Sequence, residues 1–345
     1  MDEFDFVEHY GEAEETAQSN QLPDNEIECA LNCAFVGVGG GGGKLAKAFL
    51  DLGFKKTLLI NTTEKDQPDG VGEEHLVLIP DADGVAKNIE YGKDVFTRNG
   101  AVVEDALRTK LGNVDWLFVL AGGGGGTGSA CFALDPVFQR YLNSVNGGGK
   151  VFYIMTWPSS QELLNTTITN NAVSLANDIK SAPHIVLDNE KQIKFLRGKV
   201  GMMNLFPTAN TAFAKLLSQT FKLASEKSSI QSFDSKDLER CLKTNNRMVV
   251  GTTVIKDADI PNLGSMILQN SLKRSPCPDI REKAKTGALL LVVSTEMAND
   301  PQISQHLDAA ISYVGGRTDT LFSGVYVRDN VPGLIAITLM GGLEQ

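Results

Sequence analysis

The sequence lacks the features that mark membrane, secreted and metal-binding proteins. It contains no apolar run of about 18 residues, the length that a membrane-spanning helix requires. The first 28 residues contain neither Lys nor Arg and no apolar core, so they do not resemble a secretory signal. The five cysteines are odd in number and form no Cys-x-x-Cys pair. We therefore expect a cytoplasmic protein with reduced cysteines, no metal site formed by its own side chains and no direct membrane insertion.

Basic residues are also missing from one end of the chain. The formal net charge is −10, and residues 1–28 hold ten acidic residues, which leaves 32 acidic against 32 basic residues elsewhere. An acidic arm of this composition is expected to be disordered and solubilising. The alternative is an arm that binds a basic surface on a neighbouring subunit or partner. A neutral body with an acidic arm argues against direct nucleic-acid binding.

One glycine-rich stretch organises the sequence. It follows the apolar run 116–120, which predicts a buried parallel strand, and precedes residues 130–142, which have helical spacing. The start of a helix presents backbone N–H groups and the positive end of the helix dipole, and glycine lets an anion approach the backbone. A flexible linker is the alternative, but a linker is not expected directly between a buried strand and a helix. The stretch predicts a phosphate site made by Gly123, Gly124, Gly125, Gly126, Thr127, Gly128 and Ser129.

A second strand–glycine–helix unit lies near the start of the chain. Residues 33–38 predict a strand, Gly39 to Gly43 follow, and residues 44–52 predict a helix. Gly37-x-Gly39-x-x-Gly42 formally matches the dinucleotide-binding fingerprint. It is not a P-loop, because Leu45 follows Lys44. The second strand, 56–60, ends at Asn61, where a dinucleotide fold carries Asp or Glu for the ribose; this argues against NAD.

The remaining elements predict an α/β architecture followed by a second domain. Alternating strands and helices up to about residue 196 predict a parallel sheet covered on both faces, with the ligand at the carboxyl ends of its strands. A long amphipathic helix at 206–225 precedes a helix that starts at Asp234. The later part predicts a smaller α+β domain, with strands at 248–255, 288–295, 321–327 and 333–340 and helices at about 262–272 and 302–313.

These segments together resemble the tubulin/FtsZ superfamily over most of residues 33–342. The stretch 121–129 is similar to the tubulin signature, with Ala130 in place of the signature's last glycine, and the stretch 37–43 is similar to the first nucleotide loop of FtsZ. The order and spacing of the further matching residues are also those of the family. They are Asn61-Thr62, Thr156-x-Pro158, Glu162 and Asn189.

The resemblance implies a fold, a domain division and a ligand. It implies a Rossmann-like, parallel-sheet GTP-binding domain at 29–205 after an arm at 1–28, a long central helix at 206–225, and an α+β activation domain with the catalytic loop at 226–345. The cofactors would be GTP/GDP and Mg2+. Besides the glycine-rich stretch, the implied nucleotide-binding residues are Gly39, Gly40, Gly41, Gly42, Lys44, Asn61, Thr156, Pro158, Glu162, Asn189, Phe206 and Asn210.

The resemblance also implies catalysis between subunits. Family members stack head to tail, and a loop after the central helix places acidic residues in the next subunit's nucleotide site, where they position the attacking water. Asp234 and Asp237 match these residues, and a carboxylate that orients water suits phosphoryl transfer. The alternative for this pair is a helix cap. Phe206 would stack on guanine and Asn210 would bind its edge; ordinary core packing is the alternative for Phe206.

Departures from FtsZ guide the functional hypothesis. Thr211 stands where FtsZ has Asp, Thr166 where it has Arg, and Ser232 where it has Asn, which is expected to slow hydrolysis. No long linker or C-terminal peptide for docking membrane tethers follows the last strand, which favours a relative of the plasmid- or phage-encoded tubulins. We expect a filament-forming GTPase for DNA segregation or phage positioning, with an adaptor or cargo protein as a further partner. The alternatives are an FtsZ-like division protein, a nucleotide-holding scaffold and an NAD-dependent oxidoreductase.

Overall fold

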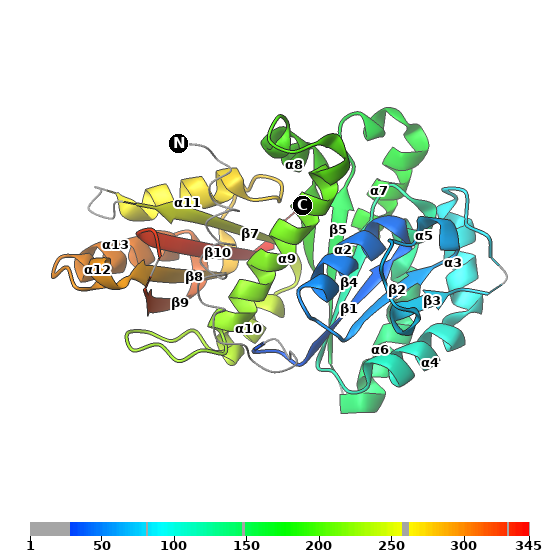
Figure 1. Ribbon diagram of the computed structural model, residues 1–345, viewed down its shortest axis with the longest axis horizontal. Helices are drawn as coiled ribbons and strands as arrows, with labels where there is room; N and C mark the ends of the chain where they lie inside the picture. The colour runs from blue at the N-terminus through cyan, green and yellow to red at the C-terminus, as the bar shows by residue number, and fades with distance from the viewer. Residues whose placement is uncertain (1–27, 81, 147–148, 257–261, 330, 345) are drawn as a thin grey trace. The chain divides into compact units, whose positions relative to one another are not determined.

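The computed structural model describes residues 28–80, 82–146, 149–256, 262–329 and 331–344. These residues form two compact units (Figure 1). The first unit comprises residues 31–215, and the second comprises residues 28–30 and 216–344; the boundary falls within helix α9, Leu205–Leu223. The predicted acidic arm, except Glu28, lies outside the described residues. No helix in the described part of the chain is long and apolar enough to cross a membrane.

The first unit contains a sheet of parallel strands, as the alternating pattern predicts. Its strand order is β3-β2-β1-β4-β5-β6, and every neighbouring pair is parallel. The carboxyl ends of the strands therefore share one edge of the sheet. The strands are β1 Cys33–Val38, β2 Thr57–Asn61, β3 Leu76–Leu78, β4 Trp116–Gly122, β5 Lys150–Trp157 and β6 Pro183–Asp188.

Side chains cover both faces of this sheet. On one face, strand residues such as Val36, Val119 and Tyr153 share a buried cluster with residues of α3 Ile89–Arg98, α4 Gly100–Leu111, α6 Asp135–Asn146 and α7 Thr166–Ile179. On the other face, the ring of Phe35 stacks on Phe49 of α2, Gly39–Asp51, with ring centroids 4.0 Å apart. Burial on both faces explains why the strands are continuous apolar runs in the sequence.

Three helices differ from the sequence-based expectations. Helix α2 begins at Gly39 rather than Lys44, so the first glycine segment is helical. The helix predicted at 96–111 is two helices, α3 and α4, broken at Asn99 beside Gly100, because both residues are poor helix formers. The helix predicted at 130–142 is a short α5, Gly126–Ser129, a 3-10 turn, Cys131–Leu134, and then α6.

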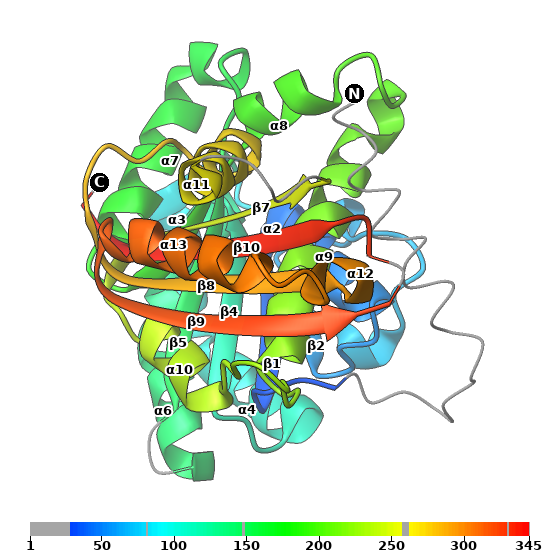
Figure 2. The same cartoon turned by 90° about the vertical axis from the view of Figure 1, so that its left-hand side faces the viewer.

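The second unit has the mixed α/β character that the sequence predicts. Its strands are β7 Asn246–Ile255, β8 Ala284–Ser294, β9 Thr318–Arg328 and β10 Leu334–Leu343. Strand β10 pairs antiparallel with β7 and β8, and β8 pairs parallel with β9 (Figure 2). Helices α11 Leu263–Arg274 and α13 Ile303–Gly315 contact each other and the sheet, and α10 Ser235–Leu242 contacts β8 and β10. The pattern does not predict the one-turn helix α12, Thr295–Ala298.

Candidate nucleotide site

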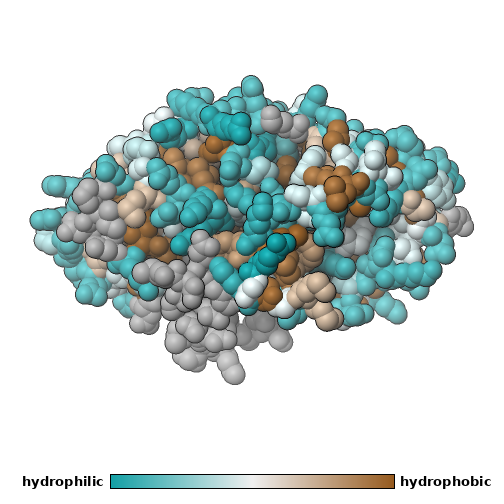
Figure 3. All heavy atoms as spheres, turned by 90° about the horizontal axis from the view of Figure 1, so that it is seen from above, coloured by the Kyte–Doolittle hydropathy of each residue, from teal (hydrophilic) through white to brown (hydrophobic). Residues whose placement is uncertain are grey.

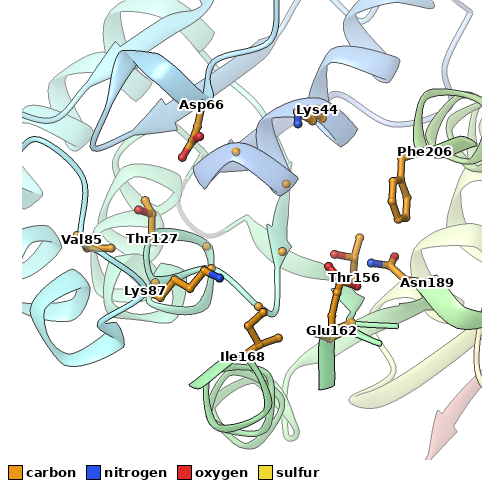
Figure 4. A pocket seen from close by; sticks show the side chains of 18 of the residues that line it. Lys44, Asp66, Val85, Lys87, Thr127, Thr156, Glu162, Ile168, Asn189 and Phe206 are labelled. Carbon is orange, nitrogen blue, oxygen red and sulfur yellow. The ribbon is translucent and has the colours of Figure 1, made fainter. Parts of the chain in front are cut away.

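A pocket of about 690 Å³ opens in the first unit, where β1, β4 and β5 end. This volume lies within the range of roughly 300–1,000 Å³ that is typical of small-molecule sites. Figure 4 shows Asp66, Thr127 and Lys87 on one side of the pocket and Phe206 and Asn189 on the other. One side is thus rich in backbone, hydroxyl and charged groups, and the other offers an aromatic ring and an amide.

The two glycine segments pack directly on each other. Gly39 has a φ of +70°, and a Cβ there would lie 2.8 Å from the backbone nitrogen of Gly128. A Cβ on Gly41 would lie 3.3 Å from the Cα of Gly122. Glycine permits both the left-handed backbone and this close approach. The segments are therefore two parts of one pocket wall, joined backbone to backbone.

Hydroxyl groups fix the second glycine segment from behind. The Oγ1 atoms of Thr62 and Thr127 are 2.8 Å apart, and Thr127 lines the pocket while remaining only 9% exposed. The buried Ser129 hydroxyl donates to the carbonyl of Gly123 at 2.9 Å. The hydroxyl that the sequence predicts to bind phosphate is therefore engaged within the turn itself. Asn61 is also buried, and its side-chain oxygen accepts the N–H of Thr62 at 2.8 Å. Ser129 and Asn61 therefore shape the wall, and their side chains do not line the pocket.

The end of β5 and the segment after it add one carboxylate to the pocket wall. Thr156, Pro158 and Glu162 line the pocket. A carboxylate oxygen of Glu162 accepts the N–H of Ser159 at 2.7 Å and its hydroxyl at 2.8 Å, so the carboxylate is held in place. The backbone N–H of Ser160 donates to Glu190 and holds the pKa of that carboxyl below its usual range. These bonds tie the segment after β5 to α8, Asn189–Leu196.

Two helix starts form the opposite side. Asn189 is the first residue of α8, and Phe206 and Asn210 lie four residues apart on α9, so they share a helix face. All three line the pocket, together with Met203. Phe206 is 40% exposed, so its ring is not an ordinary core side chain. An exposed aromatic ring beside two amides suits a flat, polar-edged ring such as a nucleobase.

The structure brings most predicted nucleotide-binding residues together. Of the nineteen, fourteen line the pocket; Gly39, Gly42, Asn61, Gly123 and Ser129 lie behind its surface. The lining also includes residues that the sequence did not indicate. Asp66 follows β2 in a short 3-10 turn, Glu64–Asp66, and Lys87 lies in the loop between β3 and α3. Residues 83–88 stand where the tubulin/FtsZ family has a glycine-rich loop, in degenerate form, so the resemblance is the signal for this loop, but it does not indicate Lys87 as a ligand.

The predicted catalytic carboxylates lie in the second unit, at the start of α10. Asp234 is the N-cap: its Oδ1 accepts the N–H of Lys236 at 2.8 Å and that of Asp237 at 3.0 Å. The side chain of Asp237 accepts the N–H of Asp234 at 3.5 Å, which completes a capping box. The helix-cap interpretation of this pair is therefore correct. Asp234 is also exposed, so the cap leaves its carboxylate accessible to solvent.

The loop before Asp234 is held by strand β9. The Tyr326 hydroxyl donates to the carbonyl of Leu223 at 2.7 Å and accepts the N–H of Phe233 at 3.1 Å. Burial raises the pKa of Tyr326, which keeps this donor neutral. The backbone of Val325 pairs with Gln231 and accepts the Ser228 hydroxyl. Arg328 pairs with Glu226 at 2.6 Å, so the loop is fixed at both ends.

The few carboxylates of the pocket suit a metal that arrives with a ligand better than one held by the protein alone. Among the described residues, no group of three or more His, Cys, Asp or Glu side chains forms a candidate metal centre. Mg2+ commonly needs only one or two protein carboxylates, because phosphates and waters complete its shell. Asp66 supplies a carboxylate on the glycine side of the pocket. The donor set is therefore compatible with Mg2+ that arrives with a polyphosphate.

Comparisons with known proteins identify the fold. No protein-family model and no curated protein matches the sequence. A GTPγS-form protofilament of TubZ from Bacillus thuringiensis serovar israelensis superposes with a TM-score of 0.80 at 18% identity, covering 98% of this chain and 93% of that one. CetZ2 from Haloferax volcanii, a GTPγS-bound protofilament, gives 0.73 at 20% identity over 91% and 94% of the two chains.

A third solved structure extends the likeness to a phage protein. TubZ from Clostridium botulinum phage c-st gives a TM-score of 0.67 at 20% identity and covers 91% of this chain and 92% of that one. TubZ and CetZ are members of the tubulin/FtsZ superfamily. Because the likeness spans both units of the chain at high structural similarity, the protein has the tubulin/FtsZ fold.

Proposed function

We propose that this protein is a GTP-binding, filament-forming GTPase of the tubulin/FtsZ type. One observation carries the proposal: a single pocket gathers both glycine segments, Glu162 and Asn189, and the pair formed by Phe206 and Asn210. Those groups come from five separate parts of the first unit and offer partners for phosphate, ribose and base. The glycine loop of a dinucleotide fold alone would explain the first segment and leave the other four unexplained.

The nucleotide would lie across the pocket from base to phosphate. Guanine would stack on Phe206, and the amides of Asn189 and Asn210 would donate to and accept from its edge. Glu162 would bind the ribose. The phosphates would lie on the backbone of Gly124 to Gly128, where N–H groups of the first helical turn have no acceptor within the helix. Asp66 would hold Mg2+, which would offset the negative charge of the phosphates.

Hydrolysis would be completed by a second copy of the chain. Asp234 uses Oδ1 for its cap, and Oδ2 would be the oxygen that orients the water attacking the terminal phosphate. A carboxylate that positions this water is one requirement of phosphoryl transfer. The bonds from Tyr326 and Val325 would hold the loop in one conformation before the subunits meet. Hydrolysis would then destabilise the filament contact.

Exposed apolar side chains support self-association. Met202 and Met203 are each 89% exposed, Leu164 is 84% exposed, and Met203 borders the pocket. On the face in Figure 3, hydrophobic groups are small and separated by hydrophilic ones, a pattern compatible with a polar-rimmed contact rather than a permanent core. Solved neighbours are protofilaments, and one is a two-stranded TubZ filament. We propose that Met202, Met203 and Leu164 contact the next subunit.

The first experiment measures GTP hydrolysis per subunit as a function of protein concentration, for the wild type and Asp234→Asn. Asn caps helices as well as Asp, so this variant removes the carboxylate and keeps α10. We expect wild-type hydrolysis only above a critical protein concentration. The hydrolysis rate of the variant should be lower by about 10²- to 10⁴-fold, with its GTP binding unchanged. Wild-type activity proportional to protein at every dilution would contradict a shared site.

A mixing experiment tests whether the pocket and the catalytic carboxylate come from different subunits. Asp234→Asn keeps the pocket, whereas Asn210→Ala weakens it and keeps Asp234. If each site takes its pocket from one chain and its carboxylate from the next, mixing the two inactive variants restores part of the turnover. If the mixture stays as inactive as its components while both variants join wild-type filaments, the carboxylate does not act across the contact.

A nucleotide-holding scaffold is the second candidate. Ser232 stands where FtsZ has Asn, and its hydroxyl accepts the N–H of Ser228 at 3.0 Å, which uses it within the loop. Firm GTP binding and assembly without turnover would favour this candidate.

For the biological role we propose DNA segregation or phage positioning through an adaptor or cargo protein, on the likeness to TubZ, including one from a phage. The FtsZ-like division role is the alternative. Fluorescently tagged protein in its host distinguishes the two: filaments that move with an extrachromosomal element support the proposal, and a ring at the division site supports the alternative.

A further inference from the structure

The loop that precedes Asp234 lies along the outer edge of strand β9. Gln231 forms an antiparallel bridge with Val325, whose N–H donates to the carbonyl of Gln231 at 2.8 Å. The side-chain amide of Gln231 donates to the Ser323 hydroxyl at 2.8 Å, and the Ser228 hydroxyl donates to the carbonyl of Val325. Strand β9 is an edge strand, so the loop pairs with backbone groups that such a strand otherwise exposes. The shape of the loop is therefore tied to β9.

One buried hydroxyl group joins three parts of the second unit. Tyr326 of β9 is 3% exposed, and its hydroxyl donates at 2.7 Å to the carbonyl of Leu223, the last residue of α9. The same oxygen accepts the N–H of Phe233 at 3.1 Å. Phe233 is fully buried, so loss of this acceptor would leave its N–H buried and unpaired, which is costly. Tyr326 thus fixes the residue directly before Asp234 relative to both α9 and β9.

A glycine of β9 lets Phe233 come close to the strand. A Cβ on Gly324 would lie 2.8 Å from the Cβ of Phe233 and 3.2 Å from its backbone nitrogen. The same Cβ would lie 2.8 Å from the ring of Tyr326. A side chain at position 324 would therefore push Phe233 away from β9. The position of Phe233 is set both by this packing and by the Tyr326 hydroxyl.

The place of the Asp234 carboxylate follows from that of Phe233. Asp234 is exposed, and its Oδ1 caps α10, so the carboxylate stays with the start of that helix. Phe233 is the residue through which the start of α10 joins the loop, and a shift of Phe233 moves the cap with it. Misplacement of a catalytic group by about 1 Å lowers a rate by up to roughly a hundredfold.

We propose that Tyr326 is a positioning residue for GTP hydrolysis: its hydroxyl acts through Phe233 to place the Asp234 carboxylate for the nucleotide of the next subunit. This inference rests on the proposed function. Tyr326 is not a catalytic residue, because it is buried in the second unit and bonds to backbone groups there. Its hydroxyl contributes to turnover and not to nucleotide affinity, since the residues that line the pocket belong to the first unit.

The test compares turnover with binding for the wild type, Tyr326→Phe and a matched control, Tyr141→Phe. Tyr141 is buried outside the pocket lining, and its hydroxyl donates to the carbonyl of Gly112 at 2.5 Å, so the control loses a bond of the same kind. In Tyr326→Phe the hydrolysis rate per assembled subunit should fall roughly ten- to a hundredfold, with the dissociation constant of GTPγS within about twofold of the wild type. Tyr141→Phe should keep both values. Equal rates in the two variants would overturn the role of Tyr326.

Gly324→Ala reaches the same contact by another route. The new methyl group would displace Phe233 while the Tyr326 hydroxyl is retained. This variant should also lose turnover per assembled subunit and keep its affinity for GTPγS. Wild-type turnover in assembled Gly324→Ala would show that the Asp234 carboxylate does not depend on where Phe233 lies, and would overturn the inference.

Mixed filaments show on which side of the subunit contact Tyr326 acts. Tyr326→Phe has an intact pocket and a displaced loop, whereas Asn210→Ala has a weakened pocket and an intact loop. An equimolar mixture should recover turnover at about one contact in four, because that share of random head-to-tail contacts joins an intact pocket to an intact loop. A mixture of Tyr326→Phe with Asp234→Asn should recover nothing, because both loops are defective. The opposite pattern would overturn the inference, and a general loss of stability would produce neither.

Failure of this inference differs from failure of the proposed function. Wild-type turnover above a critical concentration, together with full turnover in Tyr326→Phe, would overturn the role of Tyr326 and leave the proposed function in place. A wild type that does not hydrolyse GTP at any concentration would remove both.

Discussion

The two glycine segments have almost the same composition and different physical roles. In the first, Gly39 to Gly43 form the opening turns of α2, and a Cβ on Gly42 would lie 2.1 Å from the carbonyl of Leu120. In the second, Gly125 has no atom within 4 Å of a Cβ position. Gly42 is thus required by the packing of a helix against a strand backbone, whereas the Cβ position of Gly125 is open beside the pocket.

This difference distinguishes glycines required for folding from those available for binding. A substitution at Gly42 should act on stability, and one at Gly125 on nucleotide affinity. The contacts between the segments, such as Gly39 with Gly128, are where the two roles meet. The following substitutions test the distinction from the largest expected effect to the smallest.

Gly42→Ala is expected to have the largest effect. The new methyl would overlap the carbonyl of Leu120, and overpacking of this kind destabilises by about 3 kcal/mol or more when backbone must move. Gly43→Ala is the matched control in the same helix, because the nearest atom to its new Cβ, in the side chain of Leu59, would lie at an ordinary contact distance of 3.6 Å. That change should stabilise by roughly 0.5–1 kcal/mol through helix propensity. Thermal and urea unfolding give both values, and equal effects would remove the packing argument.

Gly126→Ala is expected to affect both properties. Its Cβ would lie 2.6 Å from Val85 and displace the loop that carries Lys87. A loss of about 1–3 kcal/mol in unfolding free energy is expected from the overlap, together with weaker nucleotide binding, because Gly126 lines the pocket. Unfolding curves and nucleotide titrations on the same preparation check this. Unchanged affinity with reduced stability would show that the pocket tolerates the shift.

Gly125→Ala should affect binding alone. The backbone there is extended, with φ −86° and ψ 157°, which alanine adopts without strain. The methyl group would project from a residue of the pocket lining and keep a phosphate from the backbone, so nucleotide affinity should fall roughly tenfold, about 1.4 kcal/mol. The unfolding free energy should stay within about 0.5 kcal/mol. Unaltered affinity would place the phosphates elsewhere.

The hydroxyl pair behind the second segment should give the smallest effect. Thr62 and Thr127 are within 2.8 Å, and each valine substitution leaves the other hydroxyl without this partner. A double-mutant cycle with Thr62→Val and Thr127→Val should give a coupling energy of about 1 kcal/mol in unfolding free energy. A coupling near zero would mean that the pair does not join β2 to the glycine turn.

The sequence located most of the pocket because its motifs are local. A strand followed by glycines and a helix is a short-range pattern, and the parallel strands bring Gly125, Thr156 and Asn189 to one edge. It did not separate residues that line the pocket from those behind it: Ser129 and Gly125 belong to the same motif, yet the Ser129 hydroxyl bonds within the turn. Nor did local propensity show that α2 begins at Gly39, where a φ of +70° favours glycine and the lack of a Cβ lets the backbone of Gly128 approach.

The sequence by itself determined the parallel sheet of the first unit, the α+β second unit and the helix cap at Asp234. Each of these follows from a local signal, since the spacing of apolar residues, the glycines and the capping residues act over only a few positions. The tertiary structure alone decided which side chains hold the pocket wall in place. The carbonyl of Lys87 accepts a hydrogen bond from Asn171, which lies 84 residues away in the chain, and the hydroxyl of Thr127 pairs with that of Thr62, 65 residues away. Such contacts depend on how helices and strands pack, which no local pattern would predict.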